Sequence, residues 1–295
     1  MKIRLLLLAL LTVFLTALAG QTTQALPATG SWYQPRPDDQ TPLILAHQGG
    51  EGEYPSNSML AFTQAHAAGA DALDTDMFAT SDGVLVLFHD ETLEHRTSCS
   101  GAISSKTYAQ LLQCDFAYWW TQDGGATYPY RGQGVQVVTV QQLLTAFPGA
   151  RIGLEIKQTT PLAAASLCTL IKQNNAQGRM LISSTTLPNM LTFRTFCPAV
   201  ATSATQEEVI SFYLFSNTVF LPSYNPPFSS LQVPEVFSGI PVLTADFVAD
   251  AHTYNMKVYA WTIDTPEQAQ HFIDLGVDGI NTSYPQRILD WLATQ

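Results

Sequence analysis

Charged side chains are scarce in this sequence, and positively charged ones are the scarcest. Its 295 residues include 13 Lys and Arg against 24 Asp and Glu, so the formal net charge is −11. Because nucleic-acid binding depends on basic patches, this balance argues against a nucleic-acid partner. Charged residues make up only 13% and hydrophobic residues 46%, which excludes a disordered chain and allows a large buried core. A small phosphodiester substrate stays compatible with the acidic chain if a metal cation neutralises the site locally.

Long hydrophobic runs are missing after the N-terminus, where none reaches the roughly 18 apolar residues that a membrane span requires. At the N-terminus, Lys2 and Arg4 precede an apolar run over residues 5–18, followed by small residues. This layout predicts a secretory signal peptide over residues 1–19, with a retained N-terminal anchor as the alternative. We therefore expect an exported protein, periplasmic or secreted, with no stable membrane span. The sequence predicts no particular oligomeric state.

Cysteine is also infrequent, with four residues at positions 99, 114, 168 and 197. Their spacing fits no zinc-binding pattern. An even number of cysteines in an exported chain suggests disulfides. Sequence proximity favours Cys99–Cys114 and Cys168–Cys197, but three pairings are possible and the sequence alone does not choose among them.

Residues 20–40 are rich in Pro, Asp and Gln and are predicted to be a linker, so one folded domain is expected over residues 41–295. Within that domain, short apolar segments alternate with segments of helical periodicity. Strands are expected over residues 43–46, 72–78, 84–88, 152–156, 180–183, 199–203, 241–243, 258–263 and 279–282. Helices are expected over residues 58–68, 140–146, 162–173, 188–195, 207–215, 246–254 and 266–275, with a last helix at the C-terminus.

Continuous apolar strands that alternate with helices indicate a parallel sheet covered on both faces. About eight such units in about 250 residues favour an α/β fold of the TIM-barrel type, a closed (β/α)8 barrel. The alternative is an open doubly wound sheet, but the Gly-rich segment 49–52 lacks the Gly-x-Gly-x-x-Gly spacing. The irregular segment 90–138 is predicted to be an insertion after the second strand region. The Pro-rich segment 217–240 is hard to assign.

Acidic residues stand on two of the expected strands. Asp74 and Asp76 are two apart, so on a strand they point to the same face. If that face is the barrel interior, two like charges are buried together, which is costly unless a cation holds them. Glu155 on a neighbouring strand would be a third oxygen ligand, and an all-oxygen site suits Ca²⁺ or Mg²⁺. The alternative is that these carboxylates face solvent at a strand end.

Two of the six histidines, His47 and His89, each follow an apolar strand beside the proposed metal site. In a barrel, catalytic residues lie at the carboxyl ends of the strands. A pair of imidazoles suits phosphodiester cleavage, because one can remove a proton from the attacking oxygen while the other protonates the leaving oxygen. The metal and Lys157 would offset charge on the phosphoryl oxygens. The other histidines are interpreted as surface or core residues.

Five motifs in order resemble the glycerophosphodiester phosphodiesterase family, over about residues 43–290. The first segment, LILAHQGGEGEYPSNSMLAF, is similar to the family's opening His-Arg-Gly and Pro-Glu-Asn-Thr elements. The following GADALDTDMFATSDGVLVLFHDETL is similar to its Gly-Ala-Asp, Glu-x-Asp, Thr-x-Asp-Gly and His-Asp elements. LEIK at 154–157 and YAWTIDTPEQAQHFIDLGVDGINTSYP at 259–285 are similar to its acidic strand and to its C-terminal Trp-Thr-Val and Gly-Val-Asp-Gly elements.

The resemblance implies a (β/α)8 barrel with an insertion that hydrolyses a glycerophosphodiester to an alcohol and glycerol 3-phosphate. It implies that the glycerol 2-hydroxyl attacks phosphorus to give a cyclic phosphate, which water then opens. The residues that match the family's functional positions divide into three groups. They are the acid/base pair His47 and His89, the ligands Asp74, Asp76 and Glu155 of one divalent cation, and the substrate-binding residues Gln48, Lys157 and Trp261.

The chain departs from the family pattern at four positions. Gln48 replaces the arginine that usually grips the phosphate, and Ser56 replaces the glutamate of Pro-Glu-Asn. Asp74 replaces a glutamate, and Ser283 replaces an aspartate near the last strand. Since Gln offers no charge-assisted bond, the sequence predicts weaker phosphate binding and a gain of activity in Gln48→Arg.

Three functions are therefore compared. The first is the glycerophosphodiester hydrolase, with lysophospholipase D-like activity on lysolipids as a close variant that the aromatic residues of the insertion would support. The second is a catalytically weak relative that binds glycerophosphodiesters or another polar ligand, in line with the changes at 48, 56 and 283. The third is a metal-dependent hydrolase of sugars or small metabolites on the same barrel, which fold alone does not exclude. The acid/base and metal-binding residue types are all present, which favours the hydrolase.

Overall fold

The computed structural model describes residues 31–33, 42–158, 161–216 and 224–295. The predicted signal peptide, and all of the predicted linker apart from residues 31–33, lie outside the described residues. Within the described part of the chain, no helix is both long enough and apolar enough to cross a membrane.

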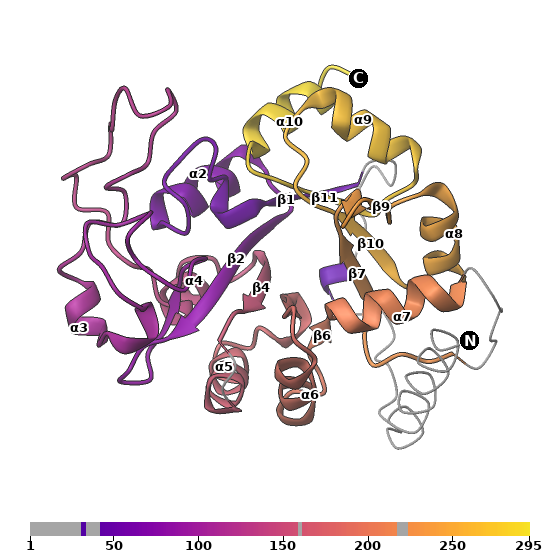
Figure 1. The fold of residues 1–295 in the computed structure, drawn as a ribbon, viewed down its shortest axis with the longest axis horizontal. Helices are drawn as coiled ribbons and strands as arrows, with labels where there is room; N and C mark the ends of the chain where they lie inside the picture. Colours follow the sequence, from indigo (N-terminus) through magenta and orange to yellow (C-terminus); the bar gives the residue numbers. More distant parts are fainter. Residues whose placement is uncertain (1–30, 34–41, 159–160, 217–223) are drawn as a thin grey trace, which may run out of the picture.

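Eight parallel strands form the barrel that the alternating pattern predicted (Figure 1). Their hydrogen-bonded order runs β6-β5-β4-β2-β1-β11-β10-β7, and a parallel bridge between Ser203 and Ser230 joins the two end strands. The open doubly wound sheet is thereby excluded. The strands are β1 (Leu43–Ala46), β2 (Ala72–Ala79), β4 (Arg151–Ile156), β5 (Met180–Ser183), β6 (Ala201–Thr202), β7 (Ser230–Val233), β10 (Lys257–Ala260) and β11 (Gly279–Thr282).

A helix follows each barrel strand and covers the outside of the sheet (Figure 1). Side-chain caps mark several helix starts: Ser58 accepts a hydrogen bond from Ala61 N, and Thr139 and Thr265 form capping boxes. The helices are α2 (Met59–Ala68), α4 (Val140–Ala146), α5 (Pro161–Gln173), α6 (Leu187–Phe196), α7 (Gln206–Ser216), α8 (Ala245–Thr253), α9 (Pro266–Asp274) and α10 (Pro285–Leu292).

The predicted insertion follows a hairpin rather than a barrel strand. β3 (Leu85–Leu87) runs antiparallel to the outer end of β2, so the apolar run 84–88 returns toward the barrel. The insertion contains η3 (Ile103–Ser105) and α3 (Tyr108–Leu111) and lies at the left of Figure 1. A disulfide joins Cys99 to Cys114 inside it, and a second joins Cys168 on α5 to Cys197 at the end of α6. Both are the pairs that sequence proximity favoured.

The barrel interior is closed at the amino-terminal ends of the strands by a small apolar cluster. Trp32, in the 3-10 helix η1 (Ser31–Tyr33), is fully buried there with Leu43, Leu45 and Tyr259. Its Nε1 donates a hydrogen bond to the hydroxyl of Tyr259 at 3.1 Å. Residues 31–33 therefore belong to the folded domain, which corrects their placement in the linker.

Two segments differ from the sequence prediction. β7 lies inside the Pro-rich segment 217–240, where no element was assigned. The extended segment expected at 241–243 belongs instead to a short surface hairpin of β8 (Val236–Phe237) and β9 (Ile240–Pro241). Elsewhere the expected strands and helices begin and end within about two residues of the observed ones, except at the carboxyl end of the strand expected over 258–263, which stops at Ala260.

Candidate active site

Two neighbouring strands carry the three predicted carboxylates. β2 and β4 are parallel and place Asp76 directly opposite Glu155, with Asp74 opposite Gly153. A Cβ added at Gly153 would lie 2.4 Å from Asp74 Oδ1, so only glycine leaves room for this carboxylate. Asp74 Oδ2 accepts a hydrogen bond from Asn281 Nδ2 at 2.8 Å, across the barrel interior from β11.

Few hydrogen-bond donors surround these carboxylates. Asp76 Oδ2 and Glu155 Oε1 are buried and have no hydrogen-bond partner among the described residues. Lys157 Nζ lies 3.1 Å from Asp76 Oδ1 and 2.8 Å from Glu155 Oε2. Burial raises the pKa of Asp74 to about 6, although the charge of His47 and the Asn281 hydrogen bond oppose the rise. Burial also raises the pKa of Glu155 despite the adjacent Lys157.

These oxygens fit a divalent cation chemically, because a bound cation would supply the partner that each buried carboxylate oxygen lacks. The side chains of Asp74, Asp76 and Glu155 are not arranged around a common point as metal ligands would be. In the described part of the chain, no group of three or more His, Cys, Asp and Glu side chains has metal-binding geometry. Lys157 bridges two of the carboxylates, and the third is turned toward Asn281.

His47 follows β1 in the 3-10 helix η2 (His47–Gly49), and a sharp turn there holds it at the barrel rim. Its Nδ1 lies 3.1 Å from Glu51 Oε1 and 3.4 Å from Ser283 Oγ. Burial lowers the pKa of His47, but the Glu51 hydrogen bond and the nearby carboxylate charges outweigh it, so the pKa is raised overall. Gln48, next in the chain, is buried and in the left-handed region at φ 50°.

His89 reaches the same edge through the β2–β3 hairpin. The hairpin brings Phe88 N to 3.0 Å from the carbonyl oxygen of Asp76, which sets His89 beside the acidic strand. Its Nδ1 lies 2.7 Å from Asp90 Oδ1. The other Asp90 oxygen accepts a hydrogen bond from Arg96 Nε at 2.9 Å. Each predicted histidine thus has its Nδ1 beside a carboxylate oxygen, an arrangement that can fix the ring orientation.

Trp261 follows β10 and lines a cavity of about 440 Å³ that starts at Glu155. From the acidic site the cavity extends between α7 and the β8–β9 hairpin, where Ile210, Leu214 and Phe237 contribute apolar walls. Its described lining residues include none from the insertion. The insertion aromatics instead pack on one another, with Tyr118, Trp119 and Tyr128 surrounding the guanidinium of Arg131 at 4.2, 4.9 and 3.7 Å.

The eight predicted site residues lie on barrel strands β2 and β4 or on the segments directly after β1, β3, β4 and β10. Sequence reasoning did not assign roles to Glu51, Asp90, Arg96 and Asn281, which contact them. Glu51 and Asp90 follow His47 and His89 closely in sequence, so a search for carboxylates near each histidine finds them. Arg96 and Asn281 carry no comparable local signal, because their partners are distant in sequence.

A sequence model of the Glycerophosphoryl diester phosphodiesterase family matches residues 47–287. The chain is 28% identical over 255 residues to a probable glycerophosphodiester phosphodiesterase 2 of Mycobacterium tuberculosis, with 85% of this chain and 90% of that protein covered. It is 27% identical over 251 residues to a glycerophosphodiester phosphodiesterase of Bacillus altitudinis, with 83% and 95% covered.

Solved structures show the same fold. One is the glycerophosphoryl diester phosphodiesterase domain of an uncharacterized Mycobacterium tuberculosis protein, at a TM-score of 0.73 and 23% identity, covering 85% of this chain and 99% of that one. Another is an Oleispira antarctica phosphodiesterase in complex with the product sn-glycerol-3-phosphate, at a TM-score of 0.69 and 22% identity, covering 86% and 97%. At these identities the likeness supports the barrel architecture.

Proposed function

The chain belongs to the glycerophosphoryl diester phosphodiesterase family, and on that basis we propose that it hydrolyses glycerophosphodiesters to an alcohol and glycerol 3-phosphate. One observation links the proposal to particular residues. Two histidines, each with a carboxylate at Nδ1, stand beside buried carboxylate oxygens that lack partners. Proton transfer and charge compensation, which phosphodiester cleavage needs, are thereby available at one end of the barrel.

His47 and His89 are the acid/base pair in this proposal. In the first step, one imidazole takes the proton of the glycerol 2-hydroxyl, whose oxygen attacks phosphorus. The other imidazole protonates the alcohol oxygen as its bond to phosphorus breaks, leaving a cyclic phosphate. Water then opens the ring with the proton transfers reversed, and the product is glycerol 3-phosphate. Glu51 and Asp90 hold the Nδ1 atoms, which leaves each Nε2 for proton exchange with the substrate in this proposal.

Asp74, Asp76 and Glu155 would hold one divalent cation, Ca²⁺ or Mg²⁺. When bound, the cation offsets negative charge on the phosphoryl oxygens. Asn281 holds Asp74 in the barrel interior. Lys157 contributes a second positive charge toward the phosphate, Gln48 is a neutral polar contact to the substrate, and Trp261 forms a wall of the binding pocket. The two disulfides support action in an oxidising compartment, as the predicted signal peptide implies.

The test is release of glycerol 3-phosphate from glycerophosphocholine and glycerophosphoethanolamine, before chelation, after it, and with Ca²⁺ or Mg²⁺ restored. Release that stops on chelation and returns with one of the cations is expected. Calorimetry adds a readout without turnover: one cation should bind, and Asp76→Asn should abolish binding while Asp246→Asn, at an exposed carboxylate on α8, should not. A folded protein that releases nothing under any condition refutes the proposed activity and favours a ligand-binding relative.

Lysolipid hydrolysis is a second candidate, favoured by the apolar cavity beside Glu155 and Trp261. An acyl chain on the leaving group would enter it, and each buried methylene contributes about 0.8 kcal/mol. Ile210→Asp should therefore raise KM for lysophosphatidylcholine by tenfold or more and leave glycerophosphocholine unaffected. Leu162→Asp, an equally drastic change at an exposed position outside the cavity, is the control. A KM for lysophosphatidylcholine that stays at the wild-type value in Ile210→Asp would rule out the cavity as an acyl site.

A further inference from the structure

Arg96, in the insertion, joins two segments of the active site that are far apart in sequence. Its Nη1 donates to Glu51 Oε2 at 2.9 Å, Ser56 Oγ at 2.9 Å and Gln48 Oε1 at 3.1 Å. Its Nε donates to Asp90 Oδ2 at 2.9 Å. The guanidinium therefore spans from the loop after β1 to the segment after β3.

The two carboxylates that Arg96 holds are the partners of the two histidines. Glu51 uses Oε1 for His47 and Oε2 for Arg96, and Asp90 uses Oδ1 for His89 and Oδ2 for Arg96. A carboxylate held at both oxygens cannot rotate without losing one charge-assisted hydrogen bond. One side chain thus constrains the orientation of both imidazoles.

The charges in this cluster depend on one another. Burial raises the pKa of Glu51, but the hydrogen bond to His47 and the charges of His47 and Arg96 outweigh it and hold the pKa at about 2. The pKa of Asp90 is also lowered, since the His89 hydrogen bond and the Arg96 charge exceed the effect of burial. Without the guanidinium, Glu51 and Asp90 would each lose a charged hydrogen-bond partner on a partly buried surface.

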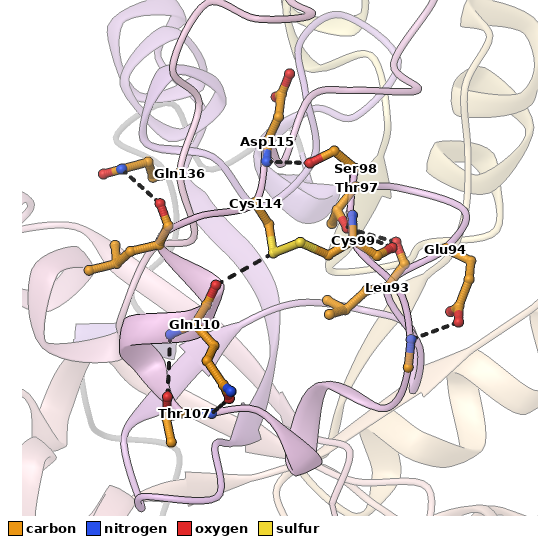
Figure 2. Close-up of a disulfide and its surroundings, with 12 residues drawn as sticks. Leu93, Glu94, Thr97, Ser98, Cys99, Thr107, Gln110, Cys114, Asp115 and Gln136 are labelled. Carbon is orange, nitrogen blue, oxygen red and sulfur yellow. Dashed lines mark hydrogen bonds between the residues drawn. A yellow bond between two sulfur atoms is a disulfide. The ribbon is translucent and has the colours of Figure 1, made fainter.

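The turn that carries Arg96 is held in place by the insertion's own contacts (Figure 2). Leu93 is fully buried, and Thr97 Oγ1 donates to its carbonyl oxygen at 2.9 Å. Beyond Thr97, the Cys99–Cys114 disulfide joins the turn to the segment after α3, and Asp115 N donates to Ser98 Oγ at 2.9 Å. The long side chain of Arg96 therefore starts from a backbone that is already fixed, which lowers the entropy cost of ordering it.

Gln48 and Ser56, two of the positions where the chain departs from the motif, are both acceptors for Arg96. The uncharged oxygens of these two side chains accept hydrogen bonds from the guanidinium of Arg96, which belongs to the insertion. An arginine at position 48 would instead bring a second positive charge close to Arg96. The departures and the insertion are thus parts of one local arrangement.

We propose that Arg96 is a positioning residue of the active site, which orients His47 and His89 together by holding Glu51 and Asp90. This inference rests on the proposed function. Displacing a reacting group by about 1 Å costs on the order of 100-fold in rate. Loss of Arg96 should therefore act mainly on kcat, since the residue sets the geometry of proton transfer.

Steady-state kinetics with glycerophosphocholine test this inference on Arg96→Gln, Arg96→Lys and the control Arg131→Gln. Arg131 is the matched control because it lies in the same insertion, stacks on its aromatics and makes none of the contacts described for Arg96. Arg96→Gln should lower kcat by about 100-fold with KM within about threefold. Arg96→Lys should recover part of that loss, and Arg131→Gln should keep kcat per folded molecule. If kcat in Arg96→Gln stays within threefold, or falls equally in Arg131→Gln, the inference is overturned.

Nitrogen-15 NMR of the histidine rings tests the same inference without turnover, so its outcome is separate from that of the proposed function. The imidazole ¹⁵N chemical shifts report hydrogen bonding at Nδ1. Both His47 and His89 signals should move in Arg96→Gln and stay in place in Arg131→Gln. Unchanged signals for both rings in Arg96→Gln would overturn the positioning role, whether or not the protein hydrolyses phosphodiesters.

Discussion

Glu51→Gln should destabilise the protein in a pH-dependent way. The side chain is 25% exposed and contacts both His47 and Arg96. The pKa of Glu51 falls from 4.5 to about 2 on folding, because the hydrogen bond to His47 and the charges of His47 and Arg96 outweigh the effect of burial. At about 1.36 kcal/mol per pH unit, this difference corresponds to about 3 kcal/mol.

The sign of the pH dependence follows from the depressed pKa. The stabilisation is present above pH 4.5 and is lost as pH falls toward 2, because protonation removes the charge that His47 and Arg96 bind. The part that involves charged His47 behaves oppositely: it is complete below pH 6.5 and is lost as pH rises through the raised pKa of His47. The penalty of Glu51→Gln should therefore be largest near pH 6, at about 3 kcal/mol, and shrink to about 1 kcal/mol at pH 3.

Urea unfolding of the wild type and Glu51→Gln at pH 6 and pH 3, followed by circular dichroism, measures this difference. Comparing the two proteins at each pH cancels the titration of groups that they share. The activity of the variant should also fall at least tenfold, since His47 loses its orienting carboxylate. A penalty below 1 kcal/mol at pH 6, or an equal penalty at both pH values, would refute the reasoning.

Three further substitutions test other parts of the structure. Gly153→Ala places a methyl group 2.4 Å from Asp74 Oδ1 and should weaken cation binding at least tenfold by calorimetry; unchanged affinity would show that Asp74 is not needed as a ligand. Trp32→Ala opens the closed end of the barrel and should cost about 3–5 kcal/mol in urea unfolding, whereas a cost below 1 kcal/mol would contradict the packing described. Gln48→Arg should lower kcat/KM for glycerophosphocholine, because Arg96 Nη1 already lies 3.1 Å from Gln48 Oε1; a gain would support the expectation from sequence alone.

The fold was predictable because short, largely apolar strand segments alternate with segments of helical periodicity along most of the chain. β7 was not predictable, because Ser230 and Gln232 alternate with its two apolar residues and leave no apolar run. The prolines before it made the whole segment look like a loop. Trp32 was missed for a related reason: its polar, Pro-rich surroundings look like a linker, and only the closed barrel provides the interior that it fills.

The candidate site was predictable where it lies on or directly after strands. Asp74 and Asp76 follow the alternation of a strand, and Glu155 lies opposite Asp76 in the register between β2 and β4. Arg96 was not predictable in this way. It reaches Glu51 across 45 residues of sequence, from a turn that lies next to the Cys99–Cys114 disulfide.

The central claim is that paired histidines carry out proton transfer in phosphodiester hydrolysis. The most direct measurement is kcat for glycerophosphocholine in His89→Ala, with His95→Ala, an exposed histidine of the same insertion, as the control. The account predicts a fall of about 100-fold or more in His89→Ala, with an unchanged circular dichroism spectrum and an unaffected control. Activity in folded His89→Ala within a few-fold of the wild type would contradict it.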